Sequence, residues 1–262
     1  MSANLNKQAL LNELLPNGRG VWIPVDHGAS QFPSSGLENM TDLYSKLGAV
    51  DAVVAQKGVV SHLSTFTGPP LIAHLSVSTV HGGEHSDNKV LVGSVEEAVA
   101  RGALAVSAQV NLGSIHENEM ITRMGELSRQ CHLQGIPLLG MMYARGPNLQ
   151  TDGDPTLGIA HAVRLGWELG CDVVKTSWTG SMETFEIVTS GVPIPVLIAG
   201  GESDGDVVGL LKMVKQSILA GGAGICMGRQ VFASNDVAGL AKALHQVVHA
   251  GIGPLDAAEK MR

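Results

Sequence analysis

The sequence predicts an α/β fold, a single (β/α)8 TIM barrel with an extra N-terminal helix. Eight short apolar runs rich in β-branched residues follow one another along the 262 residues, and near-continuous apolar character is typical of parallel strands covered on both faces. Segments of helical period separate most of these runs. An open doubly wound sheet usually shows a G-x-G-x-x-G motif after its first strand, whereas the first run here ends in "DHGAS".

The elements can be placed in order along the chain. A first helix is expected in "NKQALLNELL", within a lead-in that covers residues 1–20. The predicted strands then cover 21–26, 49–56, 71–77, 103–110, 137–143, 172–178, 195–201 and 223–228. No linker-like stretch divides the chain, so residues 1–262 are interpreted as one domain.

The connecting segments carry helix signals of different strength. Ser94 followed by Glu97 has the spacing of a capping box and marks a helix start. Residues 57–64 predict a short helix at best, and 27–36 form a loop rich in Gly, Ser and Pro. The clearest helix lies within 204–222, because apolar residues recur there at three- and four-residue steps before two glycines: Val207, Leu210, Leu211, Val214 and Ile218.

Composition excludes several classes of protein. A net charge of −7 argues against a nucleic-acid partner, because a phosphate backbone requires clustered Lys and Arg. No apolar run approaches a membrane span, and the first twenty residues lack the pattern of a secretion signal. Cys131, Cys171 and Cys226 have no paired spacing and are interpreted as core residues of a reduced protein. The location expected is therefore cytoplasmic, without a membrane partner.

Chemically useful residues follow the carboxyl ends of the predicted strands, where (β/α)8 barrels place their active sites. Buried polar groups are costly unless they are paired, so these side chains are expected to contact one another. The candidates are Asp26, His27, Tyr143, Arg145, Lys175, Trp178, Gly200, Gly201, Gly228 and Arg229.

Lys175 lies in "DVVKTSWTG", directly after two valines. A strand-end lysine usually reaches solvent or joins a structural ion pair. In an apolar barrel with other cations nearby, however, a lysine is expected to lose part of its preference for the ammonium form. The free amine attacks carbonyl carbons to form a Schiff base, which accepts electrons when the adjacent C–C bond breaks. Lys175 therefore predicts class I aldolase chemistry.

Tyr143 and Asp26 are the expected partners of this lysine. Tyr143 could be a core ring, but at a strand end its hydroxyl would reach the barrel mouth and move a proton at the substrate hydroxyl. Asp26 could cap the next turn, or its carboxylate could stabilise the iminium ion. His27, beside it, is assigned to substrate binding without a defined role.

A phosphate site is expected after the last two predicted strands. Gly200, Gly201 and Gly228 allow close approach of the backbone to an anion, and Arg229 can donate charge-assisted hydrogen bonds to it. Alternatively, these glycines only turn corners. Arg145 is assigned to substrate binding.

No metal and no cofactor is expected. The chain has ten histidines, and the H-x3-H spacing at 81–85 raises the alternative of a zinc-dependent aldolase. Its Gly-Gly centre is unfavourable for the helix that presents two histidines to one ion.

The motifs "VDHGAS", "AQKGVV", "AHLSVST", "MMYARG", "VVKTSWTG", "IAGG" and "GICMGRQVF" resemble, in this order and spacing, the archaeal-type class I aldolases of the DhnA/DeoC group. The resemblance spans residues 20–235. It implies a barrel, a Schiff-base Lys175, an acid/base Tyr143, Asp26 beside them, a terminal phosphate site and homo-oligomers. The most similar branch condenses dihydroxyacetone phosphate with aspartate semialdehyde. Trp178 and Ala144 depart from the usual Tyr and Pro, which puts the acceptor in question.

The function predicted is a Schiff-base aldolase that acts on a phosphorylated ketose or triose donor and an aldehyde. A class I fructose-1,6-bisphosphate aldolase is the alternative substrate assignment, and its second phosphate would need Arg145, Lys57 or Lys89. The same residues are also compatible with a thiolase-like acyltransferase that acts on a phosphorylated diketone, and with a non-catalytic phosphosugar-binding barrel.

Overall fold

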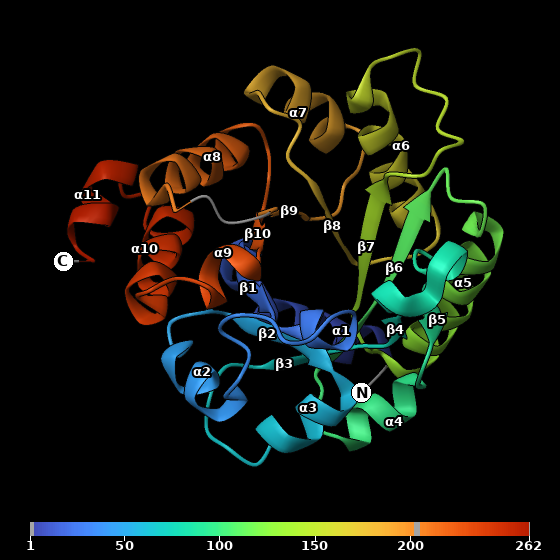
Figure 1. Cartoon of the computed structure of the whole chain (residues 1–262), viewed down its shortest axis with the longest axis horizontal. Coiled ribbons are helices and arrows are strands. Elements are labelled where there is room, and N and C mark those ends of the chain that lie inside the picture. Colours follow the sequence, from blue (N-terminus) through green and yellow to red (C-terminus); the bar gives the residue numbers. More distant parts are fainter. Residues whose placement is uncertain (1–2, 202–204, 262) are drawn as a thin grey trace.

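The computed structural model describes residues 3–201 and 205–261. Eight parallel strands close into a barrel surrounded by helices (Figure 1), which confirms the predicted fold class. In their order around the barrel the strands are β1 (Gly20–Pro24), β2 (Ala52–Gln56), β3 (Leu71–His74), β6 (Ala105–Leu112), β7 (Leu138–Ala144), β8 (Val173–Ser177), β9 (Val196–Ala199) and β10 (Gly224–Cys226).

Helices follow most strands and cover the outside of the barrel. They are α2 (Met40–Lys46), α3 (Lys57–Leu63), α4 (Val95–Ala100), α5 (Glu117–Gln134), α6 (Pro155–Glu168), α7 (Met182–Ser190), α8 (Val207–Leu219), α9 (Arg229–Phe232), α10 (Val237–His249) and α11 (Pro254–Glu259). Helix α8 confirms the helix predicted within 204–222, and α3 confirms the short one at 57–64. No helix in the described ranges is both long and apolar enough to cross a membrane.

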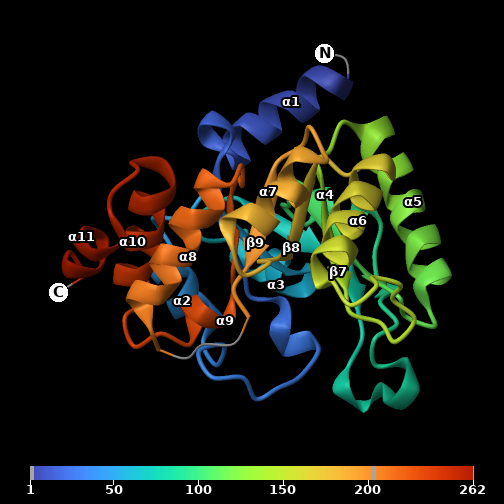
Figure 2. The ribbon, with the colours of Figure 1, turned by 90° about the horizontal axis from the view of Figure 1, so that it is seen from above.

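The predicted N-terminal helix, α1 (Ala3–Leu14), lies across one end of the barrel (Figure 2). The turn η1 (Pro16–Gly18) then leads into β1. The indole nitrogen of Trp22 donates a 2.7 Å hydrogen bond to the carbonyl oxygen of Leu14. Because these groups are buried, α1 closes the amino-terminal end of the barrel and leaves the carboxyl-terminal end open.

Only half of the predicted capping box forms at α4. The hydroxyl of Ser94 accepts a 3.1 Å hydrogen bond from the backbone N–H of Glu97. The Glu97 carboxylate does not return to the start of the helix, because it binds Lys57 and Arg101. The helix start is therefore confirmed, and the reciprocal bond is replaced by ion pairs.

Strand alternation divides the core into two layers and decides where Lys175 points. Val174 packs between the barrel and its helices, whereas Val173 lies inside the barrel with Leu139, Met141 and the carboxyl-terminal end of α1. Side chains two positions apart on a strand share a face. Lys175 therefore points into the barrel, one step nearer its open end than Val173.

The run predicted as one strand over 71–77 is two strands. β3 ends at His74, and β4 (Ser76–Val77) pairs antiparallel with β5 (Val90–Leu91). Between them lies the helical turn η3 (Val80–His85), in a segment that extends from the open end of the barrel (Figure 2, teal). Gly83 has a left-handed φ of 57° that interrupts η3. The H-x3-H motif is therefore not on a regular helix.

Candidate active site

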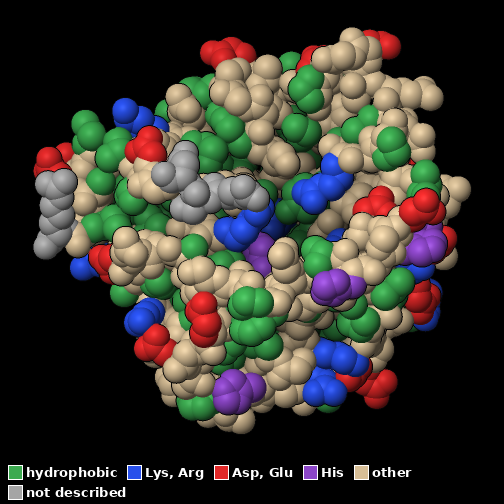
Figure 3. All heavy atoms as spheres, in the orientation of Figure 1, with side chains coloured by type: hydrophobic (Ala, Val, Ile, Leu, Met, Phe, Trp, Pro, Cys, Tyr) green, Lys and Arg blue, Asp and Glu red, His purple; other side chains and the backbone are tan. Residues whose placement is uncertain are grey.

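A cavity of about 330 Å³ opens at the carboxyl ends of the strands. Figure 3 shows the hollow near the middle of this face, with basic side chains and a histidine beside it. Nine of the ten predicted site residues line it: His27, Tyr143, Arg145, Lys175, Trp178, Gly200, Gly201, Gly228 and Arg229. Asp26 adjoins it through His27.

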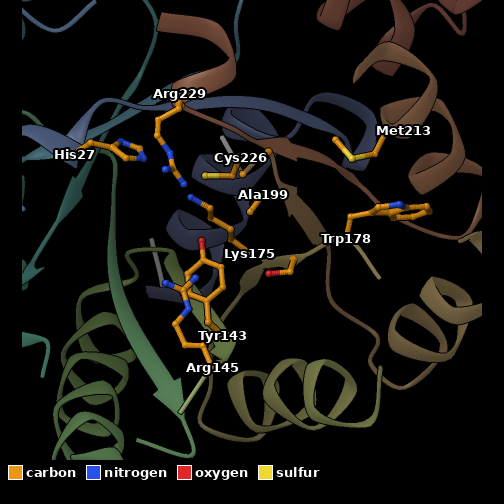
Figure 4. Close-up of a pocket in the computed structure, with 13 residues that line it drawn as sticks. His27, Tyr143, Arg145, Lys175, Trp178, Ala199, Met213, Cys226 and Arg229 are labelled. Carbon is orange, nitrogen blue, oxygen red and sulfur yellow. The ribbon is translucent and has the colours of Figure 1, made fainter. Parts of the chain in front are cut away.

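Lys175 lies at the base of this pocket and is only 6% exposed. Its neighbours across β7 and β9 are Met141 and Leu197, so its aliphatic stem is surrounded by apolar side chains. Its amine points toward the Tyr143 hydroxyl and the Arg229 guanidinium (Figure 4). The lysine is thus a buried amine that opens onto the cavity.

The expected lowering of the Lys175 pKa is wrong. Burial alone would lower the pKa, but the electrostatic influence of the Cys226 thiol, the Tyr143 phenol and the Asp26 carboxylate, with a hydrogen bond to Tyr143, outweighs burial and raises it above the ordinary lysine value. The physical reason is that an acidic group approaches the amine from each side. Lys175 is therefore an ammonium ion in the unliganded protein and must lose a proton before it can attack a carbonyl.

Tyr143 and Arg145 form one unit at the end of β7. The guanidinium carbon of Arg145 lies 3.8 Å from the centre of the Tyr143 ring, which is a cation–π contact. Tyr143 itself is buried, and its hydroxyl faces the Lys175 amine (Figure 4). The ring is thereby fixed with its hydroxyl directed at the point where Lys175 would bind a substrate carbon.

Asp26 follows β1 in the turn η2 (Asp26–Ala29) and lies between two histidines. Its carboxylate oxygens are 3.5 Å from His27 Nδ1 and 3.7 Å from His74 Nε2. Burial raises the Asp26 pKa, but His74, His27 and Lys175 outweigh burial, so the pKa lies below the ordinary value. Asp26 therefore remains a carboxylate that acts electrostatically on Lys175.

His74 and Ser107 form a buried pair beside the pocket that was not among the predicted site residues. The His74 Nδ1 atom lies 2.8 Å from the Ser107 hydroxyl, and burial lowers the His74 pKa to about 4. At neutral pH the ring is uncharged and lies between Ser107 and Asp26. The signal in the sequence was a histidine at the end of the apolar run "LIAH", but its partner is on a different strand.

Most of the phosphate site predicted after the last two strands can be placed, beginning with Gly228. A Cβ atom on Gly228 would lie 2.3 Å from the Pro24 carbonyl oxygen and 2.6 Å from His27 Cε1. Gly228 therefore allows α9 to begin against β1 and His27, and Arg229 follows it on the pocket wall. Gly200 and Gly201 follow the neighbouring strand β9, where the carbonyl oxygen of Gly200 accepts a 3.1 Å hydrogen bond from the Gln230 side chain of α9. Residues 202–204, which come next, lie outside the described residues.

Four further residues can be placed, and two of them, Cys226 and Lys57, differ from what the sequence predicted. Cys226, interpreted as a core residue, is buried but also lines the pocket beside Lys175, and burial raises its pKa to about 11. Lys57 binds Glu97 and does not line the pocket. Lys89 donates to the Ser78 hydroxyl at 2.7 Å, and its charge interacts with Asp26 and Arg145. Trp178 lines the pocket wall and packs against Phe185, with the two ring centroids 5.0 Å apart.

Comparison with known proteins shows which family and which characterised enzymes this chain resembles. A model of the DeoC/LacD aldolase family matches residues 21–234. The 2-amino-4,5-dihydroxy-6-oxo-7-(phosphonooxy)heptanoate synthase of Streptomyces griseus is 39% identical over 231 residues, which cover 87% of this chain and 84% of that protein. The 2-amino-3,7-dideoxy-D-threo-hept-6-ulosonate synthase 1 of Archaeoglobus fulgidus is 40% identical over 248 residues, or 94% and 92% of the two chains.

Solved structures agree with the sequence relatives. An archaeal fructose 1,6-bisphosphate aldolase superposes with a TM-score of 0.83 and 29% identity, covering 94% of this chain and 100% of that one. A second archaeal structure, whose catalytic lysine is covalently bound to the carbinolamine intermediate of its substrate, has a TM-score of 0.82 and 28% identity, with coverages of 92% and 99%. Since the family model and these relatives span most of the chain, the protein belongs to the DeoC/LacD family of aldolases and is a class I aldolase.

Proposed function

We propose that this aldolase condenses dihydroxyacetone phosphate with aspartate semialdehyde through a Schiff base on Lys175. The observation that carries the proposal is the buried amine of Lys175, which opens onto a cavity with Tyr143 and Arg229 beside it. The name of the Streptomyces griseus relative describes a seven-carbon phosphorylated chain. Broken between C4 and C5, that chain divides into aspartate semialdehyde and dihydroxyacetone phosphate.

The reaction follows from the chemistry of a free amine. Lys175 Nζ adds to the C2 carbonyl of the donor, and the carbinolamine loses water to give a protonated imine. Loss of a proton from C3 leaves an enamine, whose carbon bonds to the aldehyde carbon while the aldehyde oxygen takes up a proton. Water then hydrolyses the imine, which releases the product and returns the amine.

Each neighbouring group has a proposed task in this sequence. Tyr143 moves the proton at the reacting oxygen, because its hydroxyl faces the amine. Asp26 receives the lysine proton or stabilises the iminium charge, because its carboxylate is close enough to help raise the pKa of Lys175. Gly200, Gly201, Gly228 and Arg229 bind the donor phosphate by backbone N–H groups and a guanidinium.

Covalent trapping tests the assignment of Lys175. Borohydride added with dihydroxyacetone phosphate should reduce the imine and increase the mass of one peptide that contains Lys175. Lys175→Arg should prevent trapping and turnover, whereas Lys57→Arg, which changes the lysine paired with Glu97, should prevent neither. Trapping on another lysine, or full activity of Lys175→Arg, would contradict the proposal.

Fructose-1,6-bisphosphate cleavage is the second candidate, favoured by the two archaeal aldolase structures. A bisphosphate needs a second cationic site. Arg145 lines the pocket from the β7 side, and Lys89 lies close enough that the Arg145 charge, after burial, helps to lower the Lys89 pKa. A panel of aldehydes with dihydroxyacetone phosphate separates the two. Preference for glyceraldehyde 3-phosphate over aspartate semialdehyde would favour the bisphosphate, and Trp178→Tyr should alter this preference if Trp178 contacts the acceptor.

We further propose that residues 1–262 act as one barrel domain, that the enzyme is cytoplasmic and that it assembles as a homo-oligomer. The free, buried cysteines Cys131, Cys171 and Cys226 are consistent with a reducing compartment. Sedimentation velocity at several protein concentrations tests the assembly, and a single species at the monomer mass would contradict it.

A further inference from the structure

Three potential metal ligands meet at the end of the barrel opposite the pocket. Asp51 directly precedes β2, while His245 and His249 lie near the end of α10, which packs against β1 (Figure 1). One ligand atom from each of the three residues lies within 4.8 Å of the others. Within residues 3–201 and 205–261, no other set of three such side chains converges in this way.

Local structure fixes the three side chains. His245 and His249 are four residues apart on a regular helix, so their rings share one face, with centroids 4.4 Å apart. The Oδ2 atom of Asp51 accepts hydrogen bonds from the Val21 backbone N–H at 2.7 Å and from His249 Nε2 at 2.8 Å. The carboxylate is therefore held between the starts of two strands, directed at the helix.

The donors suit a transition-metal ion. Two imidazoles and one carboxylate are a ligand set that Zn²⁺ accepts, with water completing a tetrahedron. Ligand atoms about 2.1 Å from such an ion lie about 3.4 Å from one another, within the 4.8 Å spread observed here. Only side-chain rotations are needed: His249 would turn a lone pair to the ion in place of its hydrogen bond to Asp51.

Asp51 and His249 are more buried than a typical surface histidine or carboxylate. The side chains of His249 and Asp51 are 14% and 9% exposed, so the site is sheltered yet reachable from solvent. A structural ion pair between His249 and Asp51 explains two of the three residues. It leaves unexplained why His245 places its imidazole against His249, a contact between two groups that repel each other when protonated.

We propose that Asp51, His245 and His249 bind one divalent transition-metal ion, represented by Zn²⁺, that fastens α10 to the starts of β1 and β2. The ion has a structural role, because the site lies at the end of the barrel that is closed by α1. It takes no part in the chemistry proposed for Lys175, and the two proposals stand or fall separately.

Metal titration of the full-length, chelator-treated protein tests the site. Calorimetry with Zn²⁺ should show one ion per chain, and Co²⁺ should give the visible absorption of a four-coordinate complex. Saturating Zn²⁺ should raise the Tm by about 5 °C. His245→Gln should weaken binding at least about tenfold, because it removes one of three ligands while leaving the Asp51–His249 hydrogen bond in place.

Two variants control for adventitious histidine binding. His116→Gln breaks another close histidine pair, in which His85 Nδ1 lies 3.1 Å from His116 Nε2, and His132→Gln changes an exposed histidine on α5. Both should bind Zn²⁺ as the parent does. Undiminished binding by His245→Gln, loss of binding in His116→Gln, or no saturable binding at 100 µM Zn²⁺ would each overturn the proposal.

Discussion

The ionisation of Lys175 depends in part on the Asp26 carboxylate in the turn after β1. Because the Lys175 pKa is raised, the free amine is the minor form at neutral pH and increases about tenfold for each pH unit. The rate of borohydride trapping should therefore rise with pH. Asp26→Asn removes a negative charge that supports the ammonium form, so its pH–rate curve should move to lower pH by about one unit.

The control for this experiment is Asp87→Asn. The Asp87 carboxylate acts on Lys89, and it is not among the groups that shift the Lys175 pKa. Its curve should coincide with that of the parent. The position of the curve is the readout, since Asp26→Asn also lowers the maximum rate if Asp26 transfers a proton. An unshifted curve for Asp26→Asn would show that its charge does not control Lys175.

The chain has two tyrosines, which provide a matched pair of variants. Tyr143→Phe keeps the ring on which Arg145 stacks and removes the hydroxyl, so kcat should fall about 10²- to 10³-fold while imine trapping persists. Tyr44→Phe removes a buried hydroxyl that donates to the Pro69 carbonyl oxygen at 2.6 Å. It should cost about 1 kcal/mol of stability and leave kcat unchanged. Equal kcat in Tyr143→Phe and the parent would exclude proton transfer by Tyr143.

At the scale of elements, Gly228 determines how α9 meets β1. Alanine there would place its Cβ atom against the Pro24 carbonyl oxygen and His27. Relief of this overlap should cost about 1–3 kcal/mol in the free energy of unfolding. It should also raise KM for the phosphorylated donor more than it lowers kcat, because Arg229 moves with the start of α9. Gly58→Ala on α3, where an added Cβ meets nothing within 4 Å, should leave KM unchanged and raise the free energy of unfolding by up to about 1 kcal/mol, because Ala favours a helix over Gly. Urea unfolding and initial rates measure both effects.

The strands and most helices were predictable because their signals are local. The apolar run that leads to Lys175 and the stripe on α8 are both complete within a few consecutive residues. The β4–β5 pair was not predictable, since each strand has two residues and its pairing depends on the intervening segment.

The contacts and charges that depend on closure of the barrel could not be predicted from the sequence. The positions of Lys175, Tyr143 and Arg229 follow from where each strand ends. The ring of His74 meets Ser107 only because β3 pairs with β6. The raised pKa of Lys175 depends on Cys226 in β10 and on Asp26 in the turn after β1, which lie near opposite ends of the sequence. A strand pattern specifies what faces the interior, but not which charges are neighbours there.

At the scale of the whole molecule, burial of neutral His74 makes folding depend on pH. Its pKa is about 4 in the folded protein against 6.5 ordinarily, so above pH 6.5 the ring is uncharged in both states and stability is complete. As the pH falls from 6.5 toward 4, the unfolded chain binds a proton that the folded protein excludes. The resulting loss in the free energy of unfolding should reach about 3 kcal/mol near pH 4.

Urea unfolding between pH 7 and pH 4.5 measures this loss, and His74→Gln identifies its source. The pKa of His27 is also lowered, mainly by burial, so it contributes in the same direction and some dependence should remain in the variant. Asp26 does not confuse the result, because a carboxyl whose pKa is already below 3.8 takes up its proton at still lower pH. His74→Gln should therefore be less stable than the parent at pH 7 and lose less stability on acidification. If both proteins lost the same free energy over this range, the buried neutral state of His74 would not be the cause.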